Sequence, residues 1–165
     1  MIHPKLNLTQ GKNCSLHPQA YIGFNESGKG YINLKDKVTI RHGCVIRTCS
    51  GGIIIGNNTV INYNCILHAL GSIVIGSNVL ISPNVQMYAQ NHGIKKGSLI
   101  GKQPQTGKGI NICNDVWIGA GAIICDGVTI NQGAIIGAGS IVTAEYVYEN
   151  EIWAGNPARK IGDRK

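Results

Sequence analysis

A six-residue period of aliphatic residues is the feature that most constrains how this chain folds. Stepping by six from Ile112 reaches five more β-branched residues: Ile118, Ile124, Ile130, Ile136 and Val142. Small or medium residues lie four positions after the first five members, at Val116, Ala122, Val128, Ala134 and Ser140. Shorter series with the same step begin upstream at Leu34, Ile55 and Ile75, and Leu16 with Ile22 forms a partial one.

An α-helix cannot use this period, because six residues at 100° each would point successive aliphatic side chains 240° apart. A six-residue unit made of a short strand and a tight corner keeps every aliphatic residue on one side. Three such units form a triangular coil, and stacked coils bury one continuous core. The 23 glycines among 165 residues suit the corners, where a positive φ is often required. The sequence therefore predicts a single all-β solenoid domain over residues 1–165, and an ordinary β-sandwich would need less regular spacing.

The period breaks once on a large scale. Met87 and Ile112 are 25 residues apart where six would continue the repeat, so about 19 residues are inserted, around 91–111. We expect this segment to protrude as a loop, and long loops in compact domains are usually functional or disordered. His92 lies at its root, whereas the other histidines, His17 and His42 among them, are expected at surfaces or corners. We expect residues 145–165 to form a short C-terminal tail.

Composition and charge exclude several classes of protein. No segment approaches the roughly 18 consecutive apolar residues of a membrane span, and Met1–Gln10 lacks the apolar run of a signal peptide, so we expect a cytoplasmic protein. The six cysteines form no CxxC pair and are interpreted as small buried residues or inert thiols, with no metal site. The formal charge of +7 is dispersed except near the end of the chain, which favours a small anionic ligand over nucleic acid.

The repeat resembles that of the hexapeptide-repeat acyltransferases, whose coils wind as a left-handed parallel β-helix, over roughly Leu16 to Ile161. The stretch Ile81–Asn84 followed by Asn91–His92 is similar to the branch that acetylates sugars and xenobiotics, with maltose and galactoside acetyltransferases among its members. This resemblance implies that His92 is the catalytic base and that Asn84 helps to hold the acceptor.

The same resemblance implies an acetyl-CoA site. Asp115–Ala122 is similar to the family segment that lines the active-site cleft, where the N–H of Ala120 would meet the thioester oxygen. Ala154–Arg159 is similar to the C-terminal signature that binds the nucleotide end of coenzyme A. The implied cofactor-binding residues are Trp117, Gly119, Ala120, Ala138, Thr143, Asn156, Pro157, Arg159 and Lys160. The chain departs from its relatives at Ala144, where lysine is frequent, and at Glu149–Glu151, which replaces a proline-rich turn.

The resulting expectation is an acetyl-CoA-dependent O-acetyltransferase that acts on a sugar hydroxyl of a surface polysaccharide or its precursor. Transfer would be direct, with His92 as general base, no metal and no acyl-enzyme. The resemblance implies a homotrimer with active sites between subunits. Other acceptors or acyl groups stay open, including an amino sugar, serine, a xenobiotic, or a formyl or fatty acyl chain.

Two further alternatives fit less well. A γ-type carbonic anhydrase would need two zinc-binding histidines five residues apart, but Met87 and Gly97 stand five residues from His92. A non-catalytic scaffold solenoid would have no reason for the large inserted loop or for the Ala154–Arg159 signature.

Overall fold

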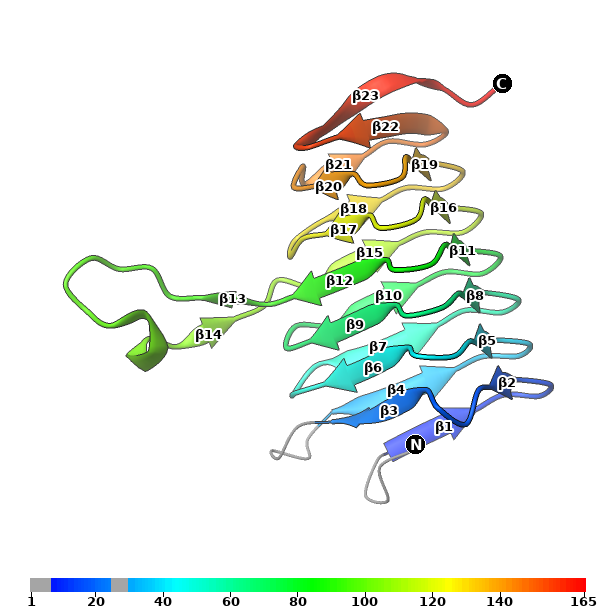
Figure 1. Cartoon of the computed structure of the whole chain (residues 1–165), viewed down its shortest axis with the longest axis horizontal. Helices are drawn as coiled ribbons and strands as arrows, with labels where there is room; N and C mark the ends of the chain where they lie inside the picture. Colours follow the sequence, from blue (N-terminus) through cyan, green and yellow to red (C-terminus); the bar gives the residue numbers. More distant parts are fainter. Residues whose placement is uncertain (1–6, 25–29) are drawn as a thin grey trace.

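The chain forms a parallel β-solenoid of about seven turns, as the hexad pattern predicts. The structure is a computed structural model that describes residues 7–24 and 30–165. Figure 1 shows the coils stacked from the N-terminal end to the C-terminal end, with a single long hairpin projecting to one side. Within the described residues no helix is both long and apolar enough to cross a membrane.

Each of the first six coils contributes one strand to each of three sheets, whose strands are parallel except for the last strand of sheet II. Sheet I has seven strands, in the order β1 (Asn7–Gln10), β4 (Tyr31–Leu34), β7 (Gly52–Ile55), β10 (Ile73–Ile75), β15 (Ile110–Ile112), β18 (Thr129–Ile130) and β21 (Tyr146–Val147). Sheet II has eight strands, in the order β2 (Ser15–Leu16), β5 (Thr39–Ile40), β8 (Val60–Ile61), β11 (Leu80–Ile81), β16 (Trp117–Ile118), β19 (Ile135–Ile136), β22 (Glu151–Gly155) and β23 (Ala158–Asp163). Sheet III has six strands, in the order β20 (Ile141–Val142), β17 (Ile123–Ile124), β12 (Gln86–Ala89), β9 (Ile66–Ala69), β6 (Val45–Thr48) and β3 (Tyr21–Phe24).

The core consists of the aliphatic ladders that the hexads predict. All six residues of the series from Ile112 to Val142 are at most 1% exposed, and so are the small residues from Val116 to Ser140. Register explains this, because each aliphatic residue pairs with its counterpart in the next coil, as Ile81 does with Ile118. Cys44, Cys49 and Cys65 are buried and the other three cysteines are half-buried, without any disulfide among the six.

The corners carry the residues with left-handed backbone. Positive φ angles occur at Asn64 (57°), Asn84 (61°), Gly121 (69°) and Gly139 (66°), which occupy the same corner in successive coils. Asparagine and glycine adopt this conformation at the lowest cost. We name the corner that leads from sheet II to sheet III the II–III corner, and the one that leads from sheet III to sheet I the III–I corner.

The inserted segment is an antiparallel hairpin that leaves the solenoid at the III–I corner (Figure 1). Its paired strands are β13 (Asn91–His92) and β14 (Gln105–Thr106), and a short 3-10 helix, η1 (Ile100–Lys102), lies between them. The solenoid resumes at β15.

The solenoid continues into residues 145–165, which were expected to form only a short tail. Strands β21 and β22 add to sheets I and II in the parallel sense, and only β23 turns back, antiparallel to β22. The turn between β22 and β23 contains a cis peptide bond between Asn156 and Pro157. This turn lies at the C-terminal end of the II–III corner, because β22 runs toward that corner. We call the C-terminal end of the solenoid the upper end and the N-terminal end the lower end, as drawn in Figure 1.

Candidate functional site

His92 is held at the root of the hairpin by its cross-strand partner. His92 and Gln105 form a register pair, and the side-chain Nε2 of Gln105 lies 3.1 Å from Nε2 of His92. The imidazole is exposed. The contact between the Gln105 amide and Nε2 thus orients the imidazole ring, and Nδ1 is left for another partner.

Asp126 fixes both strands of the hairpin root, and sequence analysis did not single it out. Its carboxylate accepts hydrogen bonds from the side chain of Asn91 (3.0 Å), from the backbone N–H of Lys108 (2.8 Å) and from that of Gly109 (2.9 Å). Asn91 directly precedes His92 on the outgoing strand, and Lys108 lies on the returning one. Asp126 therefore ties the position of His92 to the solenoid. The sequence feature that could have indicated Asp126 is an acidic residue one coil after the break in the hexad period.

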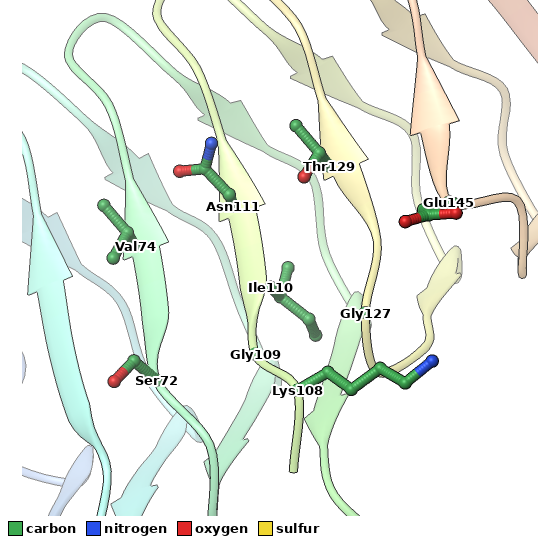
Figure 2. Close-up of a pocket in the computed structure, with 9 residues that line it drawn as sticks. All are labelled: Ser72, Val74, Lys108, Gly109, Ile110, Asn111, Gly127, Thr129 and Glu145. Atoms are coloured by element: carbon green, nitrogen blue, oxygen red, sulfur yellow. The ribbon is translucent and has the colours of Figure 1, made fainter.

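A groove of about 370 Å³ lies beside this root on sheet I. Figure 2 shows Lys108 extending past Gly127 toward Glu145, with Val74, Asn111 and Thr129 on neighbouring strands. None of the predicted site residues lines it.

The II–III corner aligns most of the predicted cofactor residues. Gly121 N–H donates to Pro83 O (2.9 Å) and Gly139 N–H donates to Ala120 O (2.8 Å), so the corners of Asn84, Ala120 and Ala138 stack directly. Ala120 and Ala138 are exposed, and the Ala120 N–H has no hydrogen-bond partner within residues 7–24 and 30–165. The corner thus presents a row of small side chains, with a backbone donor available for a ligand.

Two residues of the same set have evident structural roles. A Cβ on Gly119 would lie 2.6 Å from the backbone N of Ala138, so close stacking of coils accounts for this glycine. Asn84 has the left-handed backbone of a corner residue, which accounts for an asparagine there. Trp117 is half-exposed on sheet II and donates from Nε1 to Ser82 Oγ (3.0 Å).

The C-terminal hairpin carries the remaining predicted residues, and its two basic side chains differ. Arg159 is exposed, and its guanidinium donates only to the carbonyl of Ala158 (2.8 Å) within the described chain. Lys160 forms ion pairs with Glu151 (3.0 Å) and Asp163 (2.8 Å), and these carboxylates raise the pKa of its ammonium group. Arg159 is therefore the better donor for an anionic ligand.

Glu151 is a buried carboxylate beneath this hairpin. Desolvation alone would raise its pKa, but hydrogen bonds from Trp153 Nε1 (2.8 Å), from Lys160 and from the Tyr148 N–H (3.0 Å) together lower the pKa below its ordinary value. Charge and hydrogen bonding thus hold the hairpin on the last coil.

Within one chain the predicted residues occupy both ends of sheet III. Asn84, Ala120 and Ala138 lie at the II–III corner, whereas His92 and Thr143 lie at the III–I corner. The four-residue strand β12 separates Asn84 from the hairpin and spans about 13 Å at ~3.3 Å per residue. A single subunit therefore does not bring His92 to Ala120.

A family model described as bacterial transferase hexapeptide (six repeats) matches residues 109–144. This match covers the regular coils between the hairpin and the C-terminal turn.

Solved structures of similar fold include several transferases. A variant of AntD, an N-acyltransferase from Bacillus cereus in complex with dTDP and coenzyme A, is 27% identical, with 95% of this chain and 84% of that chain covered and a TM-score of 0.81. A hexapeptide-repeat acetyltransferase from Vibrio cholerae is 26% identical, with 97% and 75% covered and a TM-score of 0.69. A galactoside acetyltransferase in complex with coenzyme A is 30% identical, with 95% and 65% covered and a TM-score of 0.69.

Proposed function

We propose that this chain, a hexapeptide-repeat acyltransferase, transfers the acetyl group of acetyl-CoA to a hydroxyl of a sugar. The observation that carries the proposal is the hairpin that interrupts the solenoid and holds His92 at its root through Gln105 and Asp126. Histidine as a residue type suits a general base at neutral pH, because the unperturbed pKa of an imidazole side chain is near 6.5. Acyl-CoA as the acyl donor is supported by the solved structures of similar fold that contain coenzyme A.

In this proposal acetyl-CoA lies along the upper half of the II–III corner. Its nucleotide end contacts the turn at Asn156–Pro157 and the exposed guanidinium of Arg159, whose remaining N–H donors can pair with a phosphate. Its pantetheine arm passes Ala138, where the small side chain leaves room, and contacts Trp117, which is half-exposed. The thioester oxygen meets the N–H of Ala120, and a preorganised donor there stabilises the oxyanion of the tetrahedral intermediate.

His92 removes the proton from the acceptor hydroxyl as that oxygen attacks the thioester carbon. The tetrahedral intermediate then collapses, the C–S bond breaks, and the protonated His92 gives its proton to the leaving sulfur, so that coenzyme A leaves as the thiol and the neutral imidazole is regenerated. Such a base contributes about 10²–10⁴-fold to the rate. Because His92 and Ala120 lie at opposite ends of sheet III, the two groups that act on one substrate pair come from adjacent subunits of a homotrimer.

The direct test measures release of free coenzyme A thiol from acetyl-CoA with a panel of acceptors. We expect release with sugars or with nucleotide-linked sugars, and an acetylated product whose ester is cleaved by hydroxylamine. Absence of thiol release with every carbohydrate acceptor, under conditions in which the protein binds acetyl-CoA, would refute the proposal.

A second candidate is N-acylation of an amino sugar. The likeness to AntD favours it, because that N-acyltransferase gives the TM-score of 0.81 over 84% of its own chain. The same panel decides between the two candidates, since an amide product resists hydroxylamine whereas an ester does not. Surface polysaccharide or its precursor is the proposed origin of the sugar in both cases.

A further inference from the structure

The lower half of the II–III corner contains a second cavity, of about 220 Å³, that the acyl-transfer groups do not use. Side chains from three successive coils line it: His17 after β2, Arg41 and His42 after β5, and Tyr63 after β8. His17, Arg41, His42 and Tyr63 are all exposed, so the cavity opens to solvent.

Contacts among these four side chains build a basic and aromatic surface. The Arg41 guanidinium lies 5.4 Å from the centroid of the Tyr63 ring, and its NH1 is 3.5 Å from the Tyr63 hydroxyl. The imidazoles of His17 and His42 meet edge to face at 5.3 Å. His17 Nδ1 accepts the N–H of Gln19 (3.2 Å), so Nε2 of the neutral ring carries the proton and is a donor.

This surface has cationic and donor groups without a matching anion. None of the lining residues is acidic, and Arg41 makes no ion pair among the residues that the structure describes. A guanidinium beside imidazole donors suits a phosphate or diphosphate. Arg41 lies over one face of the Tyr63 ring, and the rest of this exposed ring and the exposed imidazoles suit an aromatic base, because bases stack on such rings.

The position of the cavity matches the proposed reaction. Neighbouring coils are ~4.8 Å apart, so Tyr63 lies two coils (about 10 Å) and Arg41 three coils (about 14 Å) below Ala120. Asn84 lies between them and Ala120 on the same corner. A ligand that places its sugar at Asn84 would carry a linked diphosphate, and then a base, down the corner into the cavity.

We propose that the cavity formed by His17, Arg41, His42 and Tyr63 binds the nucleoside diphosphate of a nucleotide-linked sugar, which is the acceptor. This inference rests on the proposed function in taking Ala120 as the site of the acyl group. The two substrates then approach along one corner from opposite ends, with acetyl-CoA above and the sugar nucleotide below.

Equilibrium binding without acyl-CoA tests the cavity independently of catalysis. Calorimetric titration is carried out with dTDP, UDP, inorganic pyrophosphate and thymidine. We expect a nucleoside diphosphate to bind at least about 10-fold more tightly than pyrophosphate or thymidine alone, because phosphate and base contacts both contribute. Pyrophosphate that binds as tightly as the nucleotides would overturn the proposal and point to a lipid-linked diphosphate acceptor.

Variants locate the binding. Arg41→Gln is expected to weaken nucleoside diphosphate binding about 10- to 100-fold, Arg41→Lys less, and Tyr63→Leu about 5- to 10-fold. Arg47→Gln is the matched control, because Arg47 is exposed on sheet III, outside the cavity, and carries the same charge. Thermal melts check that each variant is folded. Equal losses in Arg41→Gln and Arg47→Gln would show only a nonspecific charge effect and overturn the site.

The two proposals fail in different ways. If thiol release occurs with unlinked sugars and no nucleotide binds, acyl transfer stands and the nucleotide cavity is refuted. If nucleotides bind through Arg41 and no acceptor supports thiol release, the cavity stands and the acyl-transfer role is refuted.

Discussion

At the scale of single residues, His92 and its partner Gln105 are the pair on which the proposed chemistry depends. The break in the hexad period pointed to His92, and the resemblance of Asn91–His92 to the sugar acetyltransferase branch supplied its expected role as base. Gln105 could not be selected, because 13 residues separate it from His92 and their contact depends on the register of a hairpin that no hexad defines. Asn84 was selected for acceptor binding, and its positive φ adds a corner role that the sequence alone left equally open.

The first prediction concerns His92→Ala. We expect kcat to fall about 10²–10⁴-fold, with little change in the KM for acetyl-CoA, because the base faces the acceptor. The melting temperature should stay constant, since the imidazole is exposed. Steady-state kinetics and thermal melts measure both, with Lys96→Ala in the same loop as the control. Turnover close to that of the native chain would remove His92 from the mechanism.

The second prediction concerns Gln105→Glu. A carboxylate within hydrogen-bond distance of Nε2 stabilises the protonated, imidazolium form of the ring. Because only the neutral imidazole is a base, the acid limb of the kcat/KM profile should move to higher pH. Gln105→Leu, which keeps the size and adds no charge, should lower kcat without this displacement. An unmoved acid limb in the glutamate variant would contradict the contact.

At the scale of elements, two anchors hold the parts that the solenoid does not itself specify. The coils follow from hexads and were predicted closely, down to the burial of every aliphatic position of the series from Ile22 to Val142, whereas Leu16 in the first coil is only partly buried. The hairpin and the C-terminal turn were located only as irregular segments, because side-chain contacts of two carboxylates fix them, and no hexad encodes such contacts. Asp126 reaches back across 35 residues to Asn91, and Glu151 bonds Trp153 and Lys160 under β23.

Removal of the first anchor should affect activity more than stability. In Asp126→Ala the hairpin root loses its acceptor for three donors, so His92 is no longer held in one position. We expect kcat to fall about 10-fold or more, since positioning contributes strongly to catalysis. The melting temperature should drop by only a few degrees, about 2–8 °C. Asp126→Asn, which keeps one acceptor oxygen, should be intermediate in the same assays.

Removal of the second anchor should have a pH-dependent effect on stability. The pKa of Glu151 is lower in the folded state, so its carboxylate stabilises the fold above the unfolded pKa, and this contribution disappears as pH falls through the folded pKa. Glu151→Gln should therefore melt about 2–8 °C lower at neutral pH. The difference in melting temperature between Glu151→Gln and the native chain should become smaller at acid pH. Melting curves between neutral and acid pH measure it, and a constant difference would exclude the charged carboxylate as its cause.

At the scale of the whole molecule, the proposed reaction needs more than one copy of the chain, because His92 and Ala120 lie at different corners of a single chain. We expect sedimentation to give a trimer. We also expect that co-expressing His92→Ala with Ala138→Trp, each inactive alone, restores activity, since about a quarter of the interfaces then combine two native contributions. Each variant purified alone is the control. An active monomer, or mixed assemblies without activity, would contradict a site shared between subunits.

The antiparallel strand β23 also affects whether copies of the molecule can stack end to end. A parallel solenoid ends in open strand edges, onto which another solenoid could stack end to end into a fibre. At the C-terminal end β23 occupies the edge of sheet II with a strand of opposite direction and irregular register. To continue the coils, a second solenoid would have to pair in parallel register with the edge strands of all three sheets. Because β23 already covers the edge of sheet II, such pairing at all three edges is blocked. We therefore expect β23 to disfavour end-to-end stacking at this end of the solenoid.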